Sequence, residues 1–247
     1  MKTKLSISVV IPAFNEAEDI AKCLDSIKNQ TVAPDEIIIV DNNSTDDTLK
    51  IASKYDGIKI IKENRQGITY TRTTGFNNAK SDIIARIDAD TIASPKWVEA
   101  IVNKFSNDKT ACGLAGRVAF RELSPEKYFW FGSISAMLRR ISDLRLGKGM
   151  LMYGCNLAVR RKAWEKVSDY VHLDDCQISE DVDFSLFIKK TGKIKYCNSM
   201  IVKTKMFDLI FNLPKLSRYR RTDIITLAKH VKLDAKGIDF KHDPTKD

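Results

Sequence analysis

Two carboxylates stand one residue apart in the run Asp88-Ala89-Asp90, directly after the apolar stretch 83–87. If that stretch is a strand, Asp88 and Asp90 project to the same side of it, because side chains alternate along a strand with period two. Two close carboxylates form a hard oxygen site for Mg²⁺ or Mn²⁺, which proteins usually bind through one or two carboxylates and the phosphates of a substrate. The other interpretation is a solvated turn, in which Asp is also common.

The segments around this pair predict alternating strands and helices. Apolar runs predict strands at residues 7–11, 36–40, 58–61 and 83–87. Helical spacing predicts helices between them; the first has Asn15 and Glu18 in capping-box register, and the third covers residues 67–79. This order predicts a parallel sheet with helices on both faces and ligands at the carboxyl ends of its strands, where Asp41, Asp88 and Asp90 fall.

Strands and helices alternate less regularly in the second half of the chain. Two strands and one short strand or loop are expected, at residues 111–120, 194–197 and 154–160. Three helices are expected, at residues 95–105, at 125–141 and after a cap at Ser179. We also expect Trp97 and Trp164 in the core.

Composition narrows the class of protein. The chain of 247 residues, 43% of them hydrophobic, fits one large α/β domain. Five cysteines without a C-x-x-C pair predict neither a zinc cluster nor a disulfide framework, so we expect a reducing cytoplasm. The sequence contains no signal-peptide pattern and no run of about 18 apolar residues, and we therefore expect no membrane crossing.

The positive charge is concentrated at the C-terminal end. The formal net charge is +9, and residues 201–247 hold 11 Lys/Arg against 6 Asp/Glu. Such a tail fits nucleic acid, anionic lipid headgroups, a diphosphate-bearing substrate or a plain solvated face, and charge alone does not choose among them. No RNP, KH or helix-turn-helix pattern accompanies the charge, so we expect no nucleic-acid partner.

The position of the first glycine excludes several nucleotide-binding designs. Dinucleotide folds and P-loops need glycines just after the first strand, where the backbone approaches the phosphates. The first glycine here is Gly57, and the segment after the first strand reads PAFNE. A metal held by Asp88 and Asp90 is a substitute for that glycine cradle.

Six segments, in this order and spacing, resemble the glycosyltransferases of family 2, which have the GT-A fold. They are residues 10–16 (VIPAFNE), 39–46 (IVDNNSTD), 71–75 (TRTTG), 87–90 (IDAD), 154–161 (GCNLAVRR) and 179–181 (SED). The resemblance covers about residues 5 to 200. It implies a Rossmann-like, mostly parallel central sheet flanked by helices, with a basic helical extension at the C-terminus.

The resemblance also implies a domain division and an activity. Residues 1–205 would form the glycosyltransferase domain, with a nucleotide-binding half (1–95) and an acceptor-binding half (96–205), and residues 206–247 would be the basic extension. The implied activity is metal-dependent, inverting transfer of a single sugar from a nucleotide-sugar, with a UDP-sugar favoured, to a hydroxyl acceptor in cell-surface glycan or glycolipid synthesis. A catalytically inactive nucleotide-sugar-binding protein is the alternative.

The family's functional residues map onto matching positions of this chain. By resemblance, Asp181 is the general base and Glu180 positions groups around it; Asp90, with Asp88, binds Mn²⁺ or Mg²⁺. The nucleotide-binding candidates are Pro12, Ala13, Phe14, Glu16, Asp41, Asn43, Arg72 and Asp88. The donor-sugar and acceptor candidates are Gly154, Asn156 and Arg160. Because acids at a helix N-terminus complement the helix dipole, we expect Asp181 to be ionised at neutral pH.

Partners and location follow from the same resemblance. We expect a nucleotide-sugar donor and a glycan or lipid-linked acceptor. Aromatic and basic residues at 128–140, together with the basic tail, favour peripheral contact with a membrane, and hence a cytoplasmic protein at the inner face of the cell membrane. A C-terminal histidine such as His230 would complete the metal shell, unless it is an ordinary surface residue.

Overall fold

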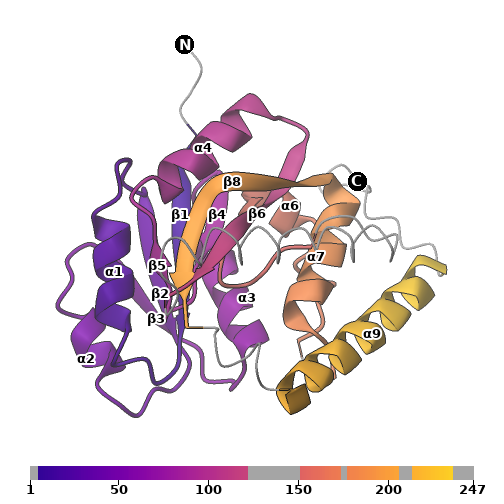
Figure 1. Cartoon of the computed structure of the whole chain (residues 1–247), viewed down its shortest axis with the longest axis horizontal. Helices are drawn as coiled ribbons and strands as arrows, with labels where there is room; N and C mark the ends of the chain where they lie inside the picture. Colours follow the sequence, from indigo (N-terminus) through magenta and orange to yellow (C-terminus); the bar gives the residue numbers. More distant parts are fainter. Residues whose placement is uncertain (1–4, 122–150, 174–176, 206–212, 236–247) are drawn as a thin grey trace.

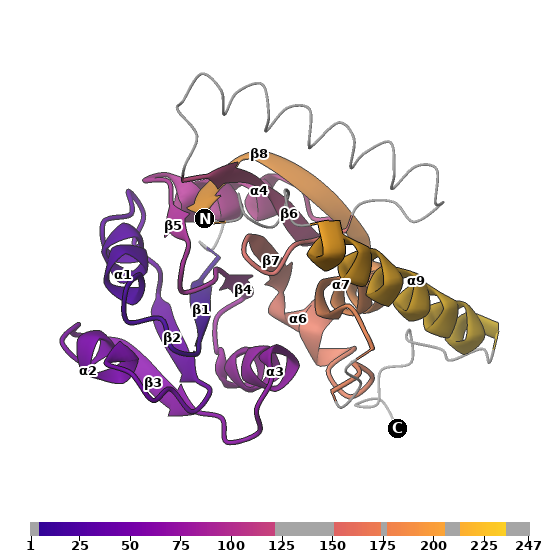
Figure 2. The same ribbon diagram turned by 60° about the horizontal axis from the view of Figure 1, so that its bottom comes forward.

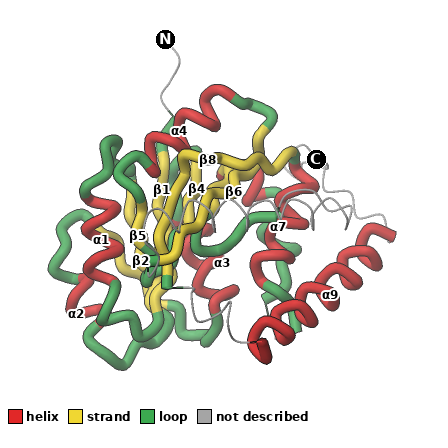
Figure 3. Tube along the Cα trace, viewed as in Figure 1, coloured by secondary structure: helices red, strands yellow, loops and turns green. Residues whose placement is uncertain are grey.

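A computed structural model of the chain describes residues 5–121, 151–173, 177–205 and 213–235. Within these residues, one sheet lies at the centre, with helices packed on both of its faces (Figures 1 and 3). The strands lie in the order β3-β2-β1-β4-β7-β6-β8-β5. Their bounds are β1 Ile7–Ala13, β2 Glu36–Asp41, β3 Ile58–Lys62, β4 Ile83–Arg86, β5 Ile92–Ala93, β6 Ala111–Phe120, β7 Leu157–Arg160 and β8 Lys193–Thr204.

The sheet combines a parallel half with a mixed half. Strands β3, β2, β1 and β4 are parallel, whereas β7 runs antiparallel to both β4 and β6. β8 is parallel to β6, and β5 pairs antiparallel with β8. The mixed α/β architecture predicted from the sequence is thus confirmed.

Helices cover the two faces because the central strands are apolar on both sides. Val9 and Ile11 of β1 belong to a core shared with α1 and α4, whereas Val10 between them belongs to a second core shared with α3, α6 and α7. Trp97 anchors the first core and Trp164 the second, both almost fully buried as predicted. The helix bounds are α1 Ile20–Lys28, α2 Thr48–Ala52, α3 Ile68–Asn78, α4 Trp97–Asn107, α6 Arg161–Glu165, α7 Glu180–Thr191 and α9 Leu213–Ala235.

Helix α9 lies outside these two layers and packs alongside α7 (Figures 1 and 2). Its Thr226 and His230 are buried, whereas Ile224 and Val231 are each 68% exposed. Across the described ranges, none of the helices combines the length and the apolar character that a membrane span requires. The helix expected at residues 125–141 lies outside the described residues.

Strand β8 is longer than the sequence pattern predicted, because a bulge lets it follow β6 along its whole length. Its pairing shifts register after Gly116. The side chain of Asn156 fills the shifted region, donating from Nδ2 to Arg117 O and Met200 O over 2.9 Å each. Its Oδ1 accepts a hydrogen bond of 2.8 Å from Trp97 Nε1. A Cβ on Gly116 would lie 2.2 Å from Asn156 Nδ2, so this position needs glycine.

Candidate active site

The carboxyl ends of neighbouring parallel strands form one edge of the site. Asp41 ends β2, and Asp88 and Asp90 follow β4. The sequence prediction assumed that Asp88 and Asp90 continue the strand and therefore share one side of it. This is wrong, because β4 ends at Arg86. The two residues belong to a turn in which Thr91 N–H donates to Asp88 O over 3.0 Å.

The loops after β1 and β2 are tied to each other beside this edge. Asn15 has a left-handed φ of 55°, and its Oδ1 accepts a hydrogen bond of 2.8 Å from Thr45 N–H. Glu16 N–H donates to Thr48 Oγ1 over 2.7 Å. The predicted cap at Asn15 is therefore wrong: α1 begins only at Ile20, and Asn15 serves the loop instead.

Asn42 organises the loop after β3. Its Nδ2 donates to Glu63 O over 2.9 Å and to Arg65 O over 2.8 Å, and its Oδ1 accepts from Gly67 N–H over 2.8 Å. These three bonds fix the approach of the chain to α3. The neighbouring Asp41 is only 2% exposed and is held at the end of the strand.

Arg86 joins the two acidic groups that the sequence singled out. Its Nε and Nη2 donate to Asp88 Oδ1 over 3.2 and 3.1 Å, and its Nη1 donates to Glu180 Oε1 over 2.8 Å. The same Nη1 lies 4.0 Å from Asp181 Oδ1. Because one buried guanidinium reaches all three carboxylates, segments 88–90 and 180–181 face each other in a single site.

Glu180 is a fixed anion within this group. Arg72, fully buried on α3, also donates from Nη1 to Glu180 Oε1, and its guanidinium lies 4.7 Å from the ring centre of Phe184. Burial alone would raise the pKa of Glu180, but the charges of Arg86 and Arg72 lower that pKa to about 2. A carboxylate shared by two guanidinium groups is suited to positioning its neighbours rather than to taking a proton.

Asp181 has the opposite electrostatic environment. Burial and the adjacent Glu180 carboxylate raise the pKa of Asp181 well above its usual range, although Arg86 opposes the shift. Burial and Glu180 thus act against the helix dipole, on which the expectation of an ionised Asp181 was based. Adjacent acids whose environments separate their pKa values are typical of sites that move protons.

Gly154 allows the backbone to approach both groups. A Cβ at this position would lie 2.6 Å from Arg86 Nη2 and 2.7 Å from Asp181 Oδ1. Any larger residue would displace the guanidinium or the carboxylate. The structure thus places one of the three donor-sugar or acceptor candidates directly against the site.

Carboxylates gather around Asp90, whose own side chain has no basic partner within the described residues. Burial, together with Asp90, Asp19 and Asp88, raises the pKa of Glu16 to about 7, and burial also raises the pKa of Asp88. Asp88 is paired with Arg86 and Asp19 with three basic residues, but in the described part of the chain no Lys or Arg is paired with the carboxylate of Asp90. An oxygen-rich group that leaves the Asp90 carboxylate without a basic partner fits a divalent cation.

The comparison with known sequences shows the family. The sequence model of glycosyl transferase family 2 matches residues 8–168. The chain belongs to this family. The family 2 chain is 27% identical over 244 residues to hyaluronan synthase from Pasteurella multocida, an alignment that covers 95% of this chain and 24% of that protein. It is 32% identical over 175 residues to glycosyltransferase AglE from Haloferax volcanii, covering 66% of this chain and 55% of that one.

The chain thus spans about a quarter of the first relative and about half of the second. Among solved structures, it resembles glucosyl-3-phosphoglycerate synthase from Mycobacterium tuberculosis in complex with Mn²⁺, uridine diphosphate and phosphoglyceric acid. The TM-score is 0.66 at 20% identity, covering 92% of this chain and 79% of that one. This likeness shows the GT-A fold that the sequence predicted.

The other nucleotide-binding candidates lie at different depths around the strand ends. Pro12 and Ala13 are buried in β1, whereas Phe14 is 47% exposed. Asn43 has a φ of 64°, and its Nδ2 donates to Asn64 O over 2.9 Å. Arg72 has no exposed surface and bonds Glu180, so in this structure it supports the Glu180–Asp181 pair from the protein interior.

Three candidates are not brought into the cluster around Arg86. Asn156 bonds the backbone of β6 and β8. Arg160 pairs with Ile83 at the start of β4, the end opposite Asp88, and its guanidinium donates to backbone carbonyls, including Ala111 O at 2.8 Å. The Nε2 of His230 lies 2.8 Å from Asp183 Oδ1 on α7, so its partner is not Asp90.

Two residues that organise the family 2 site, Arg86 and Asn42, were not predicted from the sequence. A signal for Arg86 was present: it is a charged residue inside an apolar strand, two positions before Asp88. A buried charge needs a partner, and Asp88 is the nearest acid in the sequence. Asn42 gave no comparable signal, because its partners are backbone groups more than 20 residues away.

We expect Arg86→Met to lower the free energy of unfolding by about 3 to 5 kcal/mol, because the Glu180 carboxylate, only 12% exposed, would lose a charged partner. Urea unfolding measures this change. The control is Lys50→Met, which removes a positive charge from an exposed pair with Asp47 (side chains 73% and 67% exposed) and should leave the unfolding midpoint unchanged. Equal effects of the two substitutions would contradict a central role for Arg86.

Proposed function

We propose that the chain is a metal-dependent, inverting glycosyltransferase that moves a single sugar from a nucleotide-sugar to a hydroxyl acceptor. One observation supports this most strongly: Arg86 contacts Asp88 on one side and the Glu180–Asp181 pair on the other. A donor held at the strand ends and an acceptor held at α7 would therefore meet within one site. Transfer between two bound molecules requires that juxtaposition.

The donor would lie along the carboxyl ends of β1, β2 and β4. Asp41 is held at the end of β2 to accept a hydrogen bond from a base N–H, and the exposed ring of Phe14 is available to flank the base. Asp88, fixed by Arg86, would approach the ribose. These assignments favour a UDP-sugar, and the solved structure described above contains uridine diphosphate.

Asp90, with Asp88, would hold Mn²⁺ or Mg²⁺. When bound there, the ion would act as a Lewis acid for the departing diphosphate. Glu16 adds a third carboxylate nearby, and burial together with Asp90, Asp19 and Asp88 raises its pKa to about 7. The acidic group therefore fits the ion by its charge and by the oxygen chemistry of its donors.

The acceptor hydroxyl would give its proton to Asp181. Its Oδ1 is buried against Arg86 and Gly154 and has no hydrogen-bond partner among the described residues, whereas the side chain as a whole is 34% exposed, so an acceptor would reach the carboxyl group from its exposed side. Glu180 is occupied by Arg72 and Arg86 and would hold this arrangement in place. Attack from the side opposite the leaving group inverts the configuration at the anomeric carbon.

A second candidate is a nucleotide-sugar-binding protein without turnover. The raised pKa of Asp181 is the observation that favours it, because a general base acts in its ionised form. Both candidates require nucleotide binding, and only the enzyme consumes the donor when an acceptor is present. Turnover therefore separates them.

A thermal-shift series tests the shared requirement. We expect one of the UDP-, GDP- or dTDP-sugars to raise Tm by several degrees with Mn²⁺ present and less without it, because a ligand that binds only the folded state stabilises it. The UDP-sugar is expected to give the largest shift. If no nucleotide changes Tm with or without Mn²⁺, both candidate functions are wrong.

The acceptor is proposed to be a glycan or a lipid-linked glycan at a membrane surface, in cell-surface glycan or glycolipid synthesis. The named relative hyaluronan synthase supports a glycan acceptor. The outer side of α9 supports membrane contact, because Ile224 and Val231 are exposed seven residues apart, with exposed Arg221 and Lys232 beside them. Apolar side chains among basic ones suit an anionic lipid surface.

Vesicle sedimentation tests this contact. The chain is expected to bind phosphatidylserine-containing vesicles at low salt and to bind them less at high salt. It is not expected to bind phosphatidylcholine vesicles. Ile224→Glu should weaken binding, whereas Ile60→Glu, at a 37% exposed position on β3, should not. Equal losses for the two variants, or no binding to anionic vesicles, would exclude α9 as the contact surface.

A further inference from the structure

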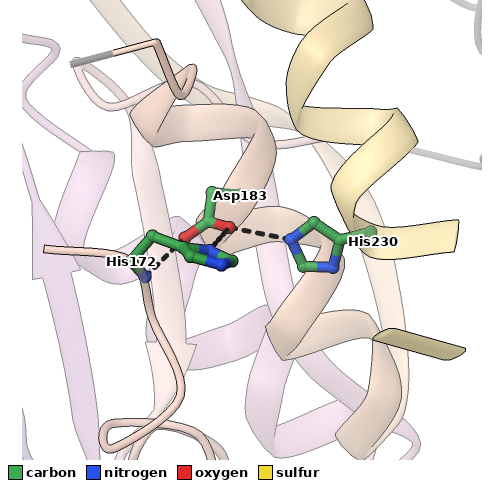
Figure 4. A group of neighbouring side chains, drawn as sticks. All are labelled: His172, Asp183 and His230. Atoms are coloured by element: carbon green, nitrogen blue, oxygen red, sulfur yellow. Dashed lines mark hydrogen bonds and ion pairs between the residues drawn. The ribbon is translucent and has the colours of Figure 1, made fainter. Parts of the chain in front are cut away.

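A second group of metal-ligating side chains lies where α9 meets α7 (Figure 4). His172 precedes α7, Asp183 lies in its first turn, and His230 comes from α9. His172 Nδ1 is 2.7 Å and His230 Nε2 is 2.8 Å from the same oxygen, Asp183 Oδ1. Three segments of the chain thus direct one donor atom each to a common point.

The spacing of these atoms is close to that of a metal shell. A tetrahedral zinc ion has bonds of about 2.0 to 2.2 Å to nitrogen and oxygen, which sets neighbouring ligand atoms about 3.3 Å apart. The three atoms of this group all lie within 4.8 Å of one another. Lengthening the two nitrogen–oxygen distances, now 2.7 and 2.8 Å, by about half an ångström would make room for an ion between these atoms.

The surroundings orient the ligands as in a built site. Asp183 is 1% exposed, and its second oxygen accepts a hydrogen bond of 3.1 Å from the backbone N–H of His172, which leaves Oδ1 directed at the two imidazoles. The ring of Phe187 lies 4.5 Å from that of His230 and 5.8 Å from that of His172. An anchored carboxylate inside an apolar wall limits water access and fixes ligand direction.

We propose that His172, Asp183 and His230 form a Zn²⁺-class metal site, separate from the oxygen site at Asp90. Two imidazoles and one carboxylate select zinc or a similar transition metal over Mg²⁺, which prefers oxygen ligands. Three protein ligands leave a fourth position for water, and His172, 27% exposed, is the solvent-facing edge of the group. This inference does not depend on the proposed sugar transfer.

Such an ion would clamp α9 onto the helix that carries Glu180 and Asp181. One turn earlier on both helices, Thr226 Oγ1 accepts a hydrogen bond of 2.8 Å from Ser179 N–H. The metal would add a second, stronger link at His230 and Asp183. Its effect would be structural: it would fix the first turn of α7 relative to the C-terminal helix.

Metal binding by the untagged full chain tests the proposal. After treatment with a chelator and in millimolar Mg²⁺, which occupies oxygen sites, Zn²⁺ is expected to bind at one equivalent and to raise Tm. Co²⁺ should give a visible absorption spectrum of nitrogen and oxygen ligands. His172→Ala, at the edge of the group, and Asp183→Asn should each weaken Zn²⁺ binding by at least about 100-fold, since loss of groups that merely orient ligands already costs 10- to 100-fold.

His242→Ala is the matched control, because it removes the third histidine of the chain and none of the three proposed ligands. It should bind Zn²⁺ as the unaltered chain does. The proposal is overturned if the unaltered chain binds no Zn²⁺ at one equivalent, or if His172→Ala and His242→Ala bind it equally. If no Zn²⁺ binds, the three side chains only form hydrogen bonds between α7 and α9. Neither result changes the nucleotide-dependent Tm shift, so failure here is distinguishable from failure of the proposed function.

Discussion

Asp181→Asn is expected to lower the turnover of sugar transfer by about 10³-fold while leaving the nucleotide-dependent rise in Tm intact. An amide has the shape of the carboxyl group but cannot accept the acceptor's proton, and a positioned general base contributes about 10²- to 10⁴-fold. Asp41 and Asp90, which would hold the donor, are unchanged. Donor consumption with a glycan or lipid acceptor measures the loss.

The same substitution should not cost stability. The pKa of Asp181 is raised in the fold, so its ionisation becomes unfavourable to folding as the pH rises above the unfolded-state pKa. The asparagine variant lacks that charge, and its unfolding free energy at neutral pH should equal or exceed that of the unaltered chain. A loss of turnover would then reflect chemistry and not unfolding.

Glu180→Gln is the matched control, because it neutralises the adjacent residue of the same helix turn. Glu180 pairs with buried Arg72 and Arg86, so its loss leaves two buried guanidinium groups short of a counter-charge and should lower stability by about 3 to 5 kcal/mol. If Asp181→Asn retains turnover and Glu180→Gln loses it without loss of stability, the assigned roles must be exchanged.

The first half of the fold could be predicted because local sequence and burial agree there. In β1, Val9 and Ile11 face one core and Val10 the other, so the strand contains the apolar run 9–11, and it continues through Pro12 to Ala13. The order of such strands and the intervening helices leaves few topologies. For the same reason, the strand ends that carry Asp41 and Asp88 were predictable.

The second half required tertiary information. Asn156 and Arg160 stand near Gly154 in the sequence, but β7 runs antiparallel to β4 and carries Arg160 to the far end of the sheet. The polar residues of β8 conceal its length, which depends on pairing with β6 across a bulge that Asn156 fills. No local sequence pattern predicts the pairing of β8 with β6.

The electrostatics of the site were also beyond local reasoning. The sequence around Asp181 predicts the start of a helix and therefore a helix dipole. It does not predict how far Asp181 is buried, or that two arginines share Glu180. Burial and the charge of Glu180 on α7 raise the pKa of Asp181, and Arg86 on β4 opposes them. Burial and the position of Arg86 depend on the folded structure and not on the local sequence.

Asp90→Ala is expected to lower turnover by about 10³-fold and to remove the Mn²⁺-dependent part of the nucleotide Tm shift. Stabilisation of a leaving diphosphate by a Lewis acid is worth several kcal/mol, and each 1.36 kcal/mol is about tenfold in rate. Within the described part of the chain, Asp90 has no paired Lys or Arg, so its removal breaks no ion pair. Stability should therefore be maintained.

Asp19→Asn is the control within the same acidic group, since Asp19 is paired where Asp90 is not. Burial would raise the pKa of Asp19, but Lys205, Arg121 and Lys22 bond its carboxylate and hold that pKa far below its usual range. Its loss should lower the unfolding free energy and leave the Mn²⁺ dependence unchanged. If instead Asp90→Ala keeps the full Mn²⁺-dependent shift, the ion is held elsewhere and the assignment of Asp90 is wrong. A shift lost equally in both variants would mean that the net charge of the group, rather than direct coordination by Asp90, attracts the ion.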